Sequence, residues 1–306
     1  MSRSPITHLR HAGFVVPDFE ASTAFYEGPW GLTRVADDDG IAFFGAEGSP
    51  EQYILRVRKG EAPSLELVAL GVDDAATVDR LAEEVAGDGL QLVTEPAKLD
   101  TPGGGYGFRF FDPDGRLTEI SSDVAERPHR ELAVGESTPV RLSHVVLNTT
   151  DSARLCSFYE QRLGFRLSDK LGDFMFFMRC QTDHHTVAVT QWPAASMNHL
   201  SFEIRDVDEF MRGTGRNVRA GAKLLWGPGR HTAGDNTFSY FEDPSGHVVE
   251  YSTALEQIVD EDSWEVHTYT LQPEHADQWG TAGPPTPEIM SKGRDNDPGL
   301  WAAAPV

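Results

Sequence analysis

Two histidines and one glutamate occupy positions from which they could share a metal ion. His144, His199 and Glu250 each lie in a short run rich in apolar residues, which predicts a β-strand. Side chains two positions apart on a strand share a face, so each of the three projects from a defined side of its strand. If they converge, two imidazoles and one carboxylate form a facial triad that leaves open positions on an octahedral metal. Nitrogen and oxygen ligands without thiolate favour Fe(II), with Mn(II) second.

Residue types alone do not make this a metal site. A strand histidine is more often a hydrogen-bonded core residue, and a mid-strand glutamate is more often a solvated one. The elements that carry the three residues therefore have to supply the argument.

Glu250 belongs to a predicted β-hairpin. Residues 238–242 form an aromatic run that predicts a strand, and residues 243–246 read Asp-Pro-Ser-Gly, which is typical of a turn. The strand that follows carries Glu250, and the strand before the turn carries Tyr240. The hairpin therefore holds Tyr240 and Glu250 in one register.

The chain contains a long internal repeat. A predicted strand over 9–18 and helix over 19–27 recur as a strand over 142–151 and helix over 152–163, and His11 precedes His144 by 133 residues. The later segments 64–73 and 111–119 likewise parallel 199–208 and 242–250. A repeat of this length predicts tandem domains, not a solenoid of short units.

The two copies differ at the candidate ligands. The first copy keeps His11 and Glu119, but this comparison places Ser64 where the second copy has His199. We therefore expect a metal site in the second copy only, with the first copy as a scaffold.

The repeat also predicts the domain boundaries. Residues 1–125 form an N-terminal non-catalytic domain, 126–139 a linker, and 140–256 a C-terminal metal-binding domain. Each copy holds two strand-helix-strand units with extra strands, which predicts an α+β fold with mixed sheets around a cavity. The tail, 257–306, is either a lid or disordered, and its aromatic residues favour docking: Trp264, Tyr269, Trp279 and Trp301.

Composition limits the classes of protein. The 306 residues are 39% hydrophobic, enough for two ordinary domains, and the net charge of −22 disfavours nucleic-acid and membrane partners. Two cysteines are too few for a disulfide framework. No signal peptide or membrane span is evident, so we expect a cytoplasmic protein.

The triad and the duplicated plan resemble a known superfamily. Together with the segment from His231 through Tyr240 and the Asp-Pro-Ser-Gly turn to Glu250, they are similar to the vicinal oxygen chelate superfamily, specifically its two-domain type I extradiol ring-cleaving dioxygenases. The resemblance covers residues 9–253. It implies tandem βαβββ modules of the glyoxalase-like fold, with a mononuclear Fe(II) held by the triad. It also implies cleavage of a catecholic ring by dioxygen to a muconic semialdehyde type of product, and a homo-oligomer.

The resemblance also assigns roles around the metal. His185 matches the acid-base histidine of the family, and His231 and Tyr240 match its substrate-side hydrogen-bonding pair. His184 is the weaker acid-base match, because the following Thr-Val-Ala aligns better with its neighbour. Adjacent histidines on a strand would face opposite ways, so we expect one of the two to point away from the cavity.

Two departures from the family pattern lie near the site. Ser239 stands before Tyr240 where the family usually has an apolar residue, which concerns local packing. Trp226 stands where relatives that cleave carboxylated catechols can carry a basic residue. A carboxylate on the substrate is therefore less well supported. We expect the cavity walls to include Phe176, Phe177, Trp192 and Trp226.

Two other functions remain open. The same fold hosts glyoxalase-like metal-dependent isomerases and thiol transferases, and also metal-free proteins that bind aromatic ligands. The set of His185, His231 and Tyr240 favours the dioxygenase, and the intact triad argues against a metal-free binding protein.

Overall fold

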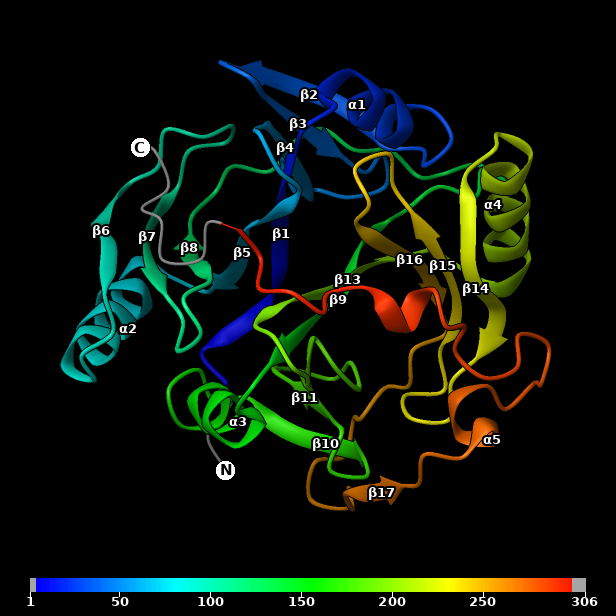
Figure 1. Cartoon of the computed structure of the whole chain (residues 1–306). Coiled ribbons are helices and arrows are strands. Elements are labelled where there is room, and N and C mark those ends of the chain that lie inside the picture. The colour runs from blue at the N-terminus through cyan, green and yellow to red at the C-terminus, as the bar shows by residue number, and fades with distance from the viewer. Residues whose placement is uncertain (1–3, 299–306) are drawn as a thin grey trace.

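Each half of the chain forms one mixed β-sheet from two βαβββ units, as the computed structural model shows for residues 4–298 (Figure 1). Trp301 lies outside the described residues. The first half contains β1 (Ile6–Val16), α1 (Phe19–Glu27), β2 (Thr33–Asp38), β3 (Ile41–Gly45), β4 (Leu55–Lys59), β5 (Ser64–Val72), α2 (Ala75–Gly87), β6 (Leu92–Lys98), β7 (Tyr106–Phe111) and β8 (Leu117–Ser122).

The second half repeats this order of elements and adds a tail. It contains β9 (Arg141–Thr149), α3 (Ser152–Gln161), β10 (Arg166–Leu171), β11 (Met175–Arg179), β12 (Val187–Gln191), β13 (Ser196–Glu203), α4 (Val207–Arg219), β14 (Lys223–Arg230), β15 (Thr237–Glu242) and β16 (Val248–Thr253). The tail contributes β17 (His267–Tyr269), α5 (Pro273–Ala276) and the 3₁₀ turn η1 (Ile289–Ser291).

The two sheets share one topology. The first has the strand order β2-β3-β4-β1-β5-β8-β7-β6, and the second has β14-β15-β16-β13-β9-β12-β11-β10-β17. In each, an antiparallel central pair is flanked by parallel neighbours, β1–β5 with β4 and β8, and β9–β13 with β12 and β16. The predicted α+β fold of tandem βαβββ modules is confirmed. No regular element lies between β8 and β9, where the linker is predicted, and the domain boundaries themselves stay a prediction.

Aspartates begin all four long helices. Each accepts a hydrogen bond from a backbone N–H in the first turn, which satisfies one of the donors left free at a helix start. The matched segments 64–73 and 199–208 end at Asp73 and Asp208, but the residues that cap α2 and α4 are Asp74 and Asp206. The four caps are Asp18, Asp74, Asp151 and Asp206.

The turn between β15 and β16 is held by its own aspartate, Asp243. The Asp243 Oδ1 atom accepts the N–H groups of Ser245 and His247, both at 2.9 Å, and Gly246 takes a φ of +92° that suits glycine. The other Asp243 oxygen accepts the Tyr26 hydroxyl at 2.8 Å from α1. The turn that positions Glu250 is therefore anchored by a residue of the first half.

Apolar packing joins the helices to one face of each sheet. The main core includes Tyr26, Val78, Leu155 and Phe210 from the helices, with alternate residues of the central strands beneath them. The opposite face of the second sheet is thus free to carry the polar site. Within the described residues, no helix is both long and apolar enough to span a membrane.

Candidate metal centre and active site

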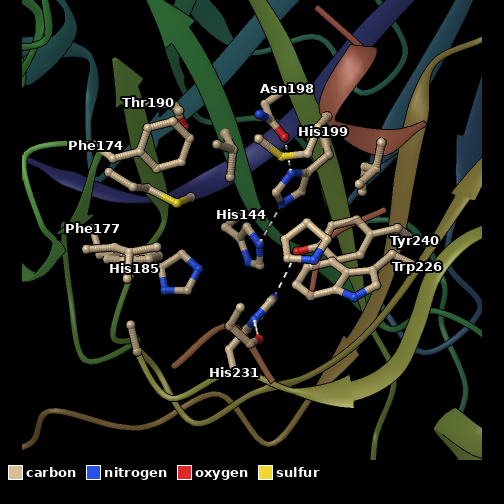
Figure 2. Close-up of a pocket in the computed structure, with 18 of the residues that line it drawn as sticks. His144, Phe174, Phe177, His185, Thr190, Asn198, His199, Trp226, His231 and Tyr240 are labelled. Carbon is tan, nitrogen blue, oxygen red and sulfur yellow. Dashed lines mark hydrogen bonds between the residues drawn. The ribbon is translucent and has the colours of Figure 1, made fainter. Parts of the chain in front are cut away.

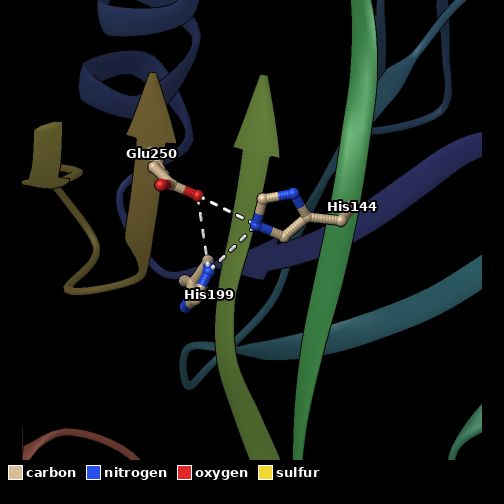
Figure 3. Close-up of side chains that lie close together, drawn as sticks. All are labelled: His144, His199 and Glu250. Atoms are coloured by element: carbon tan, nitrogen blue, oxygen red, sulfur yellow. Dashed lines mark hydrogen bonds and ion pairs between the residues drawn. The ribbon is translucent and has the colours of Figure 1, made fainter. Parts of the chain in front are cut away.

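Three neighbouring strands bring the predicted ligands together. His144 lies on β9, His199 on β13 and Glu250 on β16 (Figure 3). The Glu250 Oε2 atom lies 3.0 Å from His144 Nε2 and 3.4 Å from His199 Nε2, and the two Nε2 atoms are 3.4 Å apart. All three side chains are buried. This is the convergence that the sequence predicts.

Neighbouring side chains fix which imidazole nitrogen faces the centre. The His199 Nδ1–H group donates to Asn198 Oδ1 at 2.8 Å, and the hydroxyl of Ser143 lies 3.0 Å from His144 Nδ1, where it can accept. His199 therefore carries its proton on Nδ1 and presents the Nε2 lone pair inward, and the Ser143 hydroxyl allows His144 the same tautomer. Such outer partners orient metal-binding histidines.

The donor set fits a cation. Glu250 is fully buried, and within the described residues neither carboxylate oxygen has a partner of hydrogen-bond geometry. Two nitrogen lone pairs and a carboxylate facing one another would repel unless a positive charge lay between them. The site is therefore built for a metal ion.

The first half lacks one of the three ligands, as the sequence comparison indicated. The position of the missing ligand, however, differs from the one that the comparison gave. Leu67 pairs with Gly13 as His199 pairs with Val146, and these partners lie two residues after His11 and His144. The counterpart of His199 is thus Leu67, and the assignment to Ser64 was wrong. Both strands have a β-bulge at the equivalent place, Glu66 and Asn198, and the pairing with β1 and β9 sets the register, which letter-by-letter matching does not detect.

An arginine takes the place of the metal charge in the first half. Arg109 pairs with Glu119 in the register in which Tyr240 pairs with Glu250. Its Nε–H donates to Glu119 Oε2 at 2.9 Å, while His11 Nε2 lies 3.4 Å from the other Glu119 oxygen. The buried carboxylate is thus neutralised by the guanidinium, which supports a scaffold role for this half.

A cavity opens above the metal centre (Figure 2). Its volume is about 140 Å³, comparable with the ~150 Å³ cavity that can hold benzene. The predicted walls Phe177, Trp192 and Trp226 do line it, whereas Phe176 does not. Within the described residues, the lining contains no Lys, Arg, Asp or Glu.

His185 and His184 lie in the segment before β12, not on a strand, so strand alternation does not apply to them. Their Nδ1 atoms are 3.0 Å apart. Only His185 lines the cavity, with its ring centroid 4.3 Å from that of His144. Burial, together with the neighbouring His144 and His184, lowers the pKa of His185 well below its usual value.

His231 and Tyr240 form a pair at the other side of the cavity (Figure 2). The Tyr240 hydroxyl lies 2.9 Å from His231 Nε2, and His231 Nδ1–H donates to the carbonyl of Ala276 at 2.7 Å. Since a carbonyl can only accept, the His231 proton lies on Nδ1, and Nε2 accepts the Tyr240 O–H. Burial lowers the pKa of His231 to about 4 and raises that of Tyr240 well above 10.

The tail covers this end of the cavity. Ala276 of α5 and Ile289 of η1 are among its lining residues, and the Trp226 indole donates to the carbonyl of Gly283 at 3.0 Å. The docked form of the tail, favoured by its aromatic residues, is the one found for residues 257–298. A function as a lid stays a prediction.

Four residues around the site were not anticipated. Ser143 and Asn198 orient the candidate ligands, Ala276 fixes the proton of His231, and Asp169 lies 2.9 Å from His184 Nε2. Ser143 and Asn198 directly precede ligand histidines, which is a usable local signal. Nothing local in the sequence marks the other two.

Comparison with protein families identifies the class. The model of the glyoxalase/bleomycin resistance protein/dioxygenase superfamily matches residues 8–120 and 141–251. The chain therefore belongs to this superfamily, with one match in each half.

Individual relatives carry two kinds of name. The chain is 28% identical to metapyrocatechase 2 of Cupriavidus necator, over 94% of this chain and 92% of that protein. It is 29% identical to biphenyl-2,3-diol 1,2-dioxygenase of Paraburkholderia xenovorans (strain LB400), over 85% and 91%. It is also 42% identical in sequence to a Mn(II)-bound glyoxalase from Novosphingobium aromaticivorans. The crystal structure of that protein superimposes with a TM-score of 0.93 over 98% of this chain and 99% of that one. The resemblance to ring-cleaving dioxygenases is confirmed by the first two.

Proposed function

We propose that this protein is an extradiol dioxygenase that opens a catecholic ring with dioxygen at a mononuclear Fe(II), giving a muconic semialdehyde type of product. One observation carries the proposal: His185 and the His231–Tyr240 pair flank the His144, His199 and Glu250 centre within one apolar cavity. An isomerase of this fold would not need that set of proton-handling groups. The names of the two dioxygenase relatives support the same activity.

The side chains divide the work around the metal. A bound Fe(II) would supply Lewis-acid polarisation of the two catechol oxygens and a path for electrons to dioxygen. His185 is neutral at pH 7 because burial lowers its pKa, so it can accept a proton from a substrate hydroxyl and later return it. Tyr240 stays protonated and donates to His231, which leaves a lone pair to accept the second substrate hydroxyl. His231 acts here by orienting Tyr240.

Fe(II) is our first choice of metal and Mn(II) our second. A 2-His-1-carboxylate set with open positions is typical of Fe(II) oxygenases. The Mn(II) in the Novosphingobium structure keeps the alternative open.

The cavity favours a catechol with an uncharged substituent. A carboxylated side chain would need a cationic partner in an apolar wall, and the described lining offers none. Phe174, Phe177 and Trp192 offer aromatic surfaces instead.

Oxygen uptake tests the proposal. Protein reconstituted with Fe(II) under anaerobic conditions should consume one dioxygen per catechol and form a yellow product, faster with 3-methylcatechol or 2,3-dihydroxybiphenyl than with 3,4-dihydroxyphenylacetate. No uptake with any of these catechols would reject the activity.

A glyoxalase-like isomerase is the second candidate, because the Novosphingobium relative is named a glyoxalase. The same preparation, loaded with Mn(II) or Fe(II), should then turn over the hemithioacetal of glutathione and methylglyoxal without using dioxygen. A metal-free binding protein is the third candidate, and less than stoichiometric metal after reconstitution would favour it.

A homo-oligomer and a cytoplasmic location also stay proposals. They rest on the family resemblance and on composition, and light scattering of the purified protein tests the first.

A further inference from the structure

A buried carboxylate and a second histidine lie behind His185. Asp169 of β10 is fully buried, and its Oδ2 atom lies 2.9 Å from His184 Nε2. The other nitrogen of His184, Nδ1, lies 3.0 Å from His185 Nδ1. Asp169, His184 and His185 therefore form one hydrogen-bonded chain that ends at the cavity.

The positions of the protons follow from the donors and acceptors. An ionised Asp169 only accepts, so His184 must carry its proton on Nε2. A neutral His184 then has a lone pair on Nδ1, and the 3.0 Å contact requires His185 to carry its proton on its own Nδ1. Within the described residues no group hydrogen-bonds to His185 Nε2, so this atom keeps a free lone pair in the cavity wall.

We propose that Asp169 and His184 are positioning residues that hold His185 in the Nδ1–H tautomer, so that its Nε2 is the base that faces the substrate. This inference rests on the proposed function for the identity of the proton donor. When a substrate hydroxyl gives its proton to Nε2, the oxygen keeps the electron pair and His185 becomes an imidazolium. Its Nδ1–H remains donated to His184, and the Asp169 carboxylate balances the positive charge through His184.

The surroundings confine the chain of three residues to this geometry. The ring of Phe177 contacts both histidines, at centroid distances of 5.7 Å to His184 and 5.1 Å to His185. Gly234 has a φ of +82°, and a Cβ there would lie 3.0 Å from His184 Nδ1. The Phe177 ring and the backbone of Gly234 thus pack closely around the two imidazoles.

The tail closes the outer side of this chain. β17 pairs with β10 (Figure 1), and the backbone N–H of His267 donates to Asp169 Oδ1 at 2.8 Å. The Trp264 indole donates to the carbonyl of Ser168 at 2.8 Å, and its ring lies 5.9 Å from that of His184. Asp169 could therefore serve only to anchor the tail, and the test has to separate that role from control of the tautomer.

The tautomer can be measured directly in the metal-free protein. With ¹⁵N-labelled histidine, the ring nitrogen shifts of the wild type should show a proton on Nδ1 of His185 and on Nε2 of His184. In Asp169→Asn the amide can donate to His184 Nε2, which moves the His184 proton to Nδ1 and the His185 proton to Nε2. A wild type with the His185 proton on Nε2 would overturn the proposal even if no variant folds.

Turnover gives the second readout. In the Fe(II)-loaded enzyme, Asp169→Asn should lower kcat by about 10- to 100-fold, the range typical of losing an outer partner of a metal-binding histidine. KM and metal content should stay close to those of the wild type. The matched control is Asp173→Asn, an exposed position on the same β10–β11 hairpin. This variant should keep the kcat, KM and metal content of the wild type.

The outcomes separate the two roles of Asp169. If Asp169→Asn loosens the tail, seen as faster proteolysis after β16, but keeps the His185 proton on Nδ1 and kcat at the Asp173→Asn level, the residue is only an anchor and the proposal fails. If the wild type has no dioxygenase activity, the tautomers still decide the positioning role, and only the proposed function is lost.

Discussion

Leu67 occupies the position in the first sheet that His199 occupies in the second. Leu67 follows the bulge residue Glu66 on β5 and pairs with Gly13, two residues after His11. His199 follows the bulge residue Asn198 on β13 and pairs with Val146, two residues after His144. Leu67 is fully buried beside Ala69 and Phe111. The duplication thus placed an apolar side chain in one copy where the other has a candidate metal ligand.

This pair provides a matched test of the metal centre. His199→Leu should reduce the metal content of reconstituted protein from about one equivalent to near zero, because two remaining ligands leave the site open to water. Leu67→Ala should keep full metal content but lower the free energy of unfolding by roughly 2–5 kcal/mol, through the cavity it leaves. Metal analysis and urea unfolding measure the two effects. Full metal in His199→Leu would contradict the ligand assignment.

Removing the cavity histidine should separate binding from turnover. His185→Phe should retain Fe(II), since His185 is not part of the converging triad, and should lower kcat by about 10²- to 10⁴-fold through loss of the proton acceptor. His129→Phe, at an exposed position of the linker, is the control. Stopped-flow measurement of product formation checks both. An unchanged rate in His185→Phe would remove its acid-base role.

The tail should influence substrate affinity. Ile289 lines the cavity from η1 and packs against the cluster that contains Trp226 and Tyr240. Ile289→Ala should raise KM for 3-substituted catechols about 10-fold, as expected when a substrate loses apolar wall contacts. Met211→Ala, on the exposed side of α4, should have no such effect. Equal KM values in the two variants would show that the tail does not contact the substrate.

The metal-free protein should lose stability on acidification. Burial lowers the pKa of His231 to about 4, and burial also lowers the pKa of His11. The unfolded chain therefore binds protons first as pH falls below about 6.5, so stability decreases from there towards pH 4. For His231, which solvent partly reaches, the loss is roughly 1–2 kcal/mol by pH 5. Calorimetry at pH 7.5 and pH 5 measures it.

The control for this titration is His231→Asn. Its amide can still donate to the Ala276 carbonyl, but it has no ionisable group. The fall in melting temperature between pH 7.5 and pH 5 should be smaller in this variant. A melting temperature that stays level in the wild type would contradict the shifts in pKa.

Local patterns in the sequence were sufficient for the repeated elements and for the three candidate ligands. Strand alternation and the Asp-Pro-Ser-Gly turn depend on only a few neighbouring residues, so the sequence shows them directly. The hairpin that carries Tyr240 and Glu250 was predicted for this reason, and its two residues do pair directly.

Only the tertiary structure decided the register and the partners of the site. The counterpart of His199 is Leu67, not Ser64, because the pairing of β5 with β1 and of β13 with β9 sets the register, with a bulge at the equivalent place in both strands. The contacts of His231 with Ala276 and of His184 with Asp169 join residues 45 and 15 positions apart. Such contacts depend on how the tail and the sheet pack, so they cannot be inferred from the pattern of neighbouring residues.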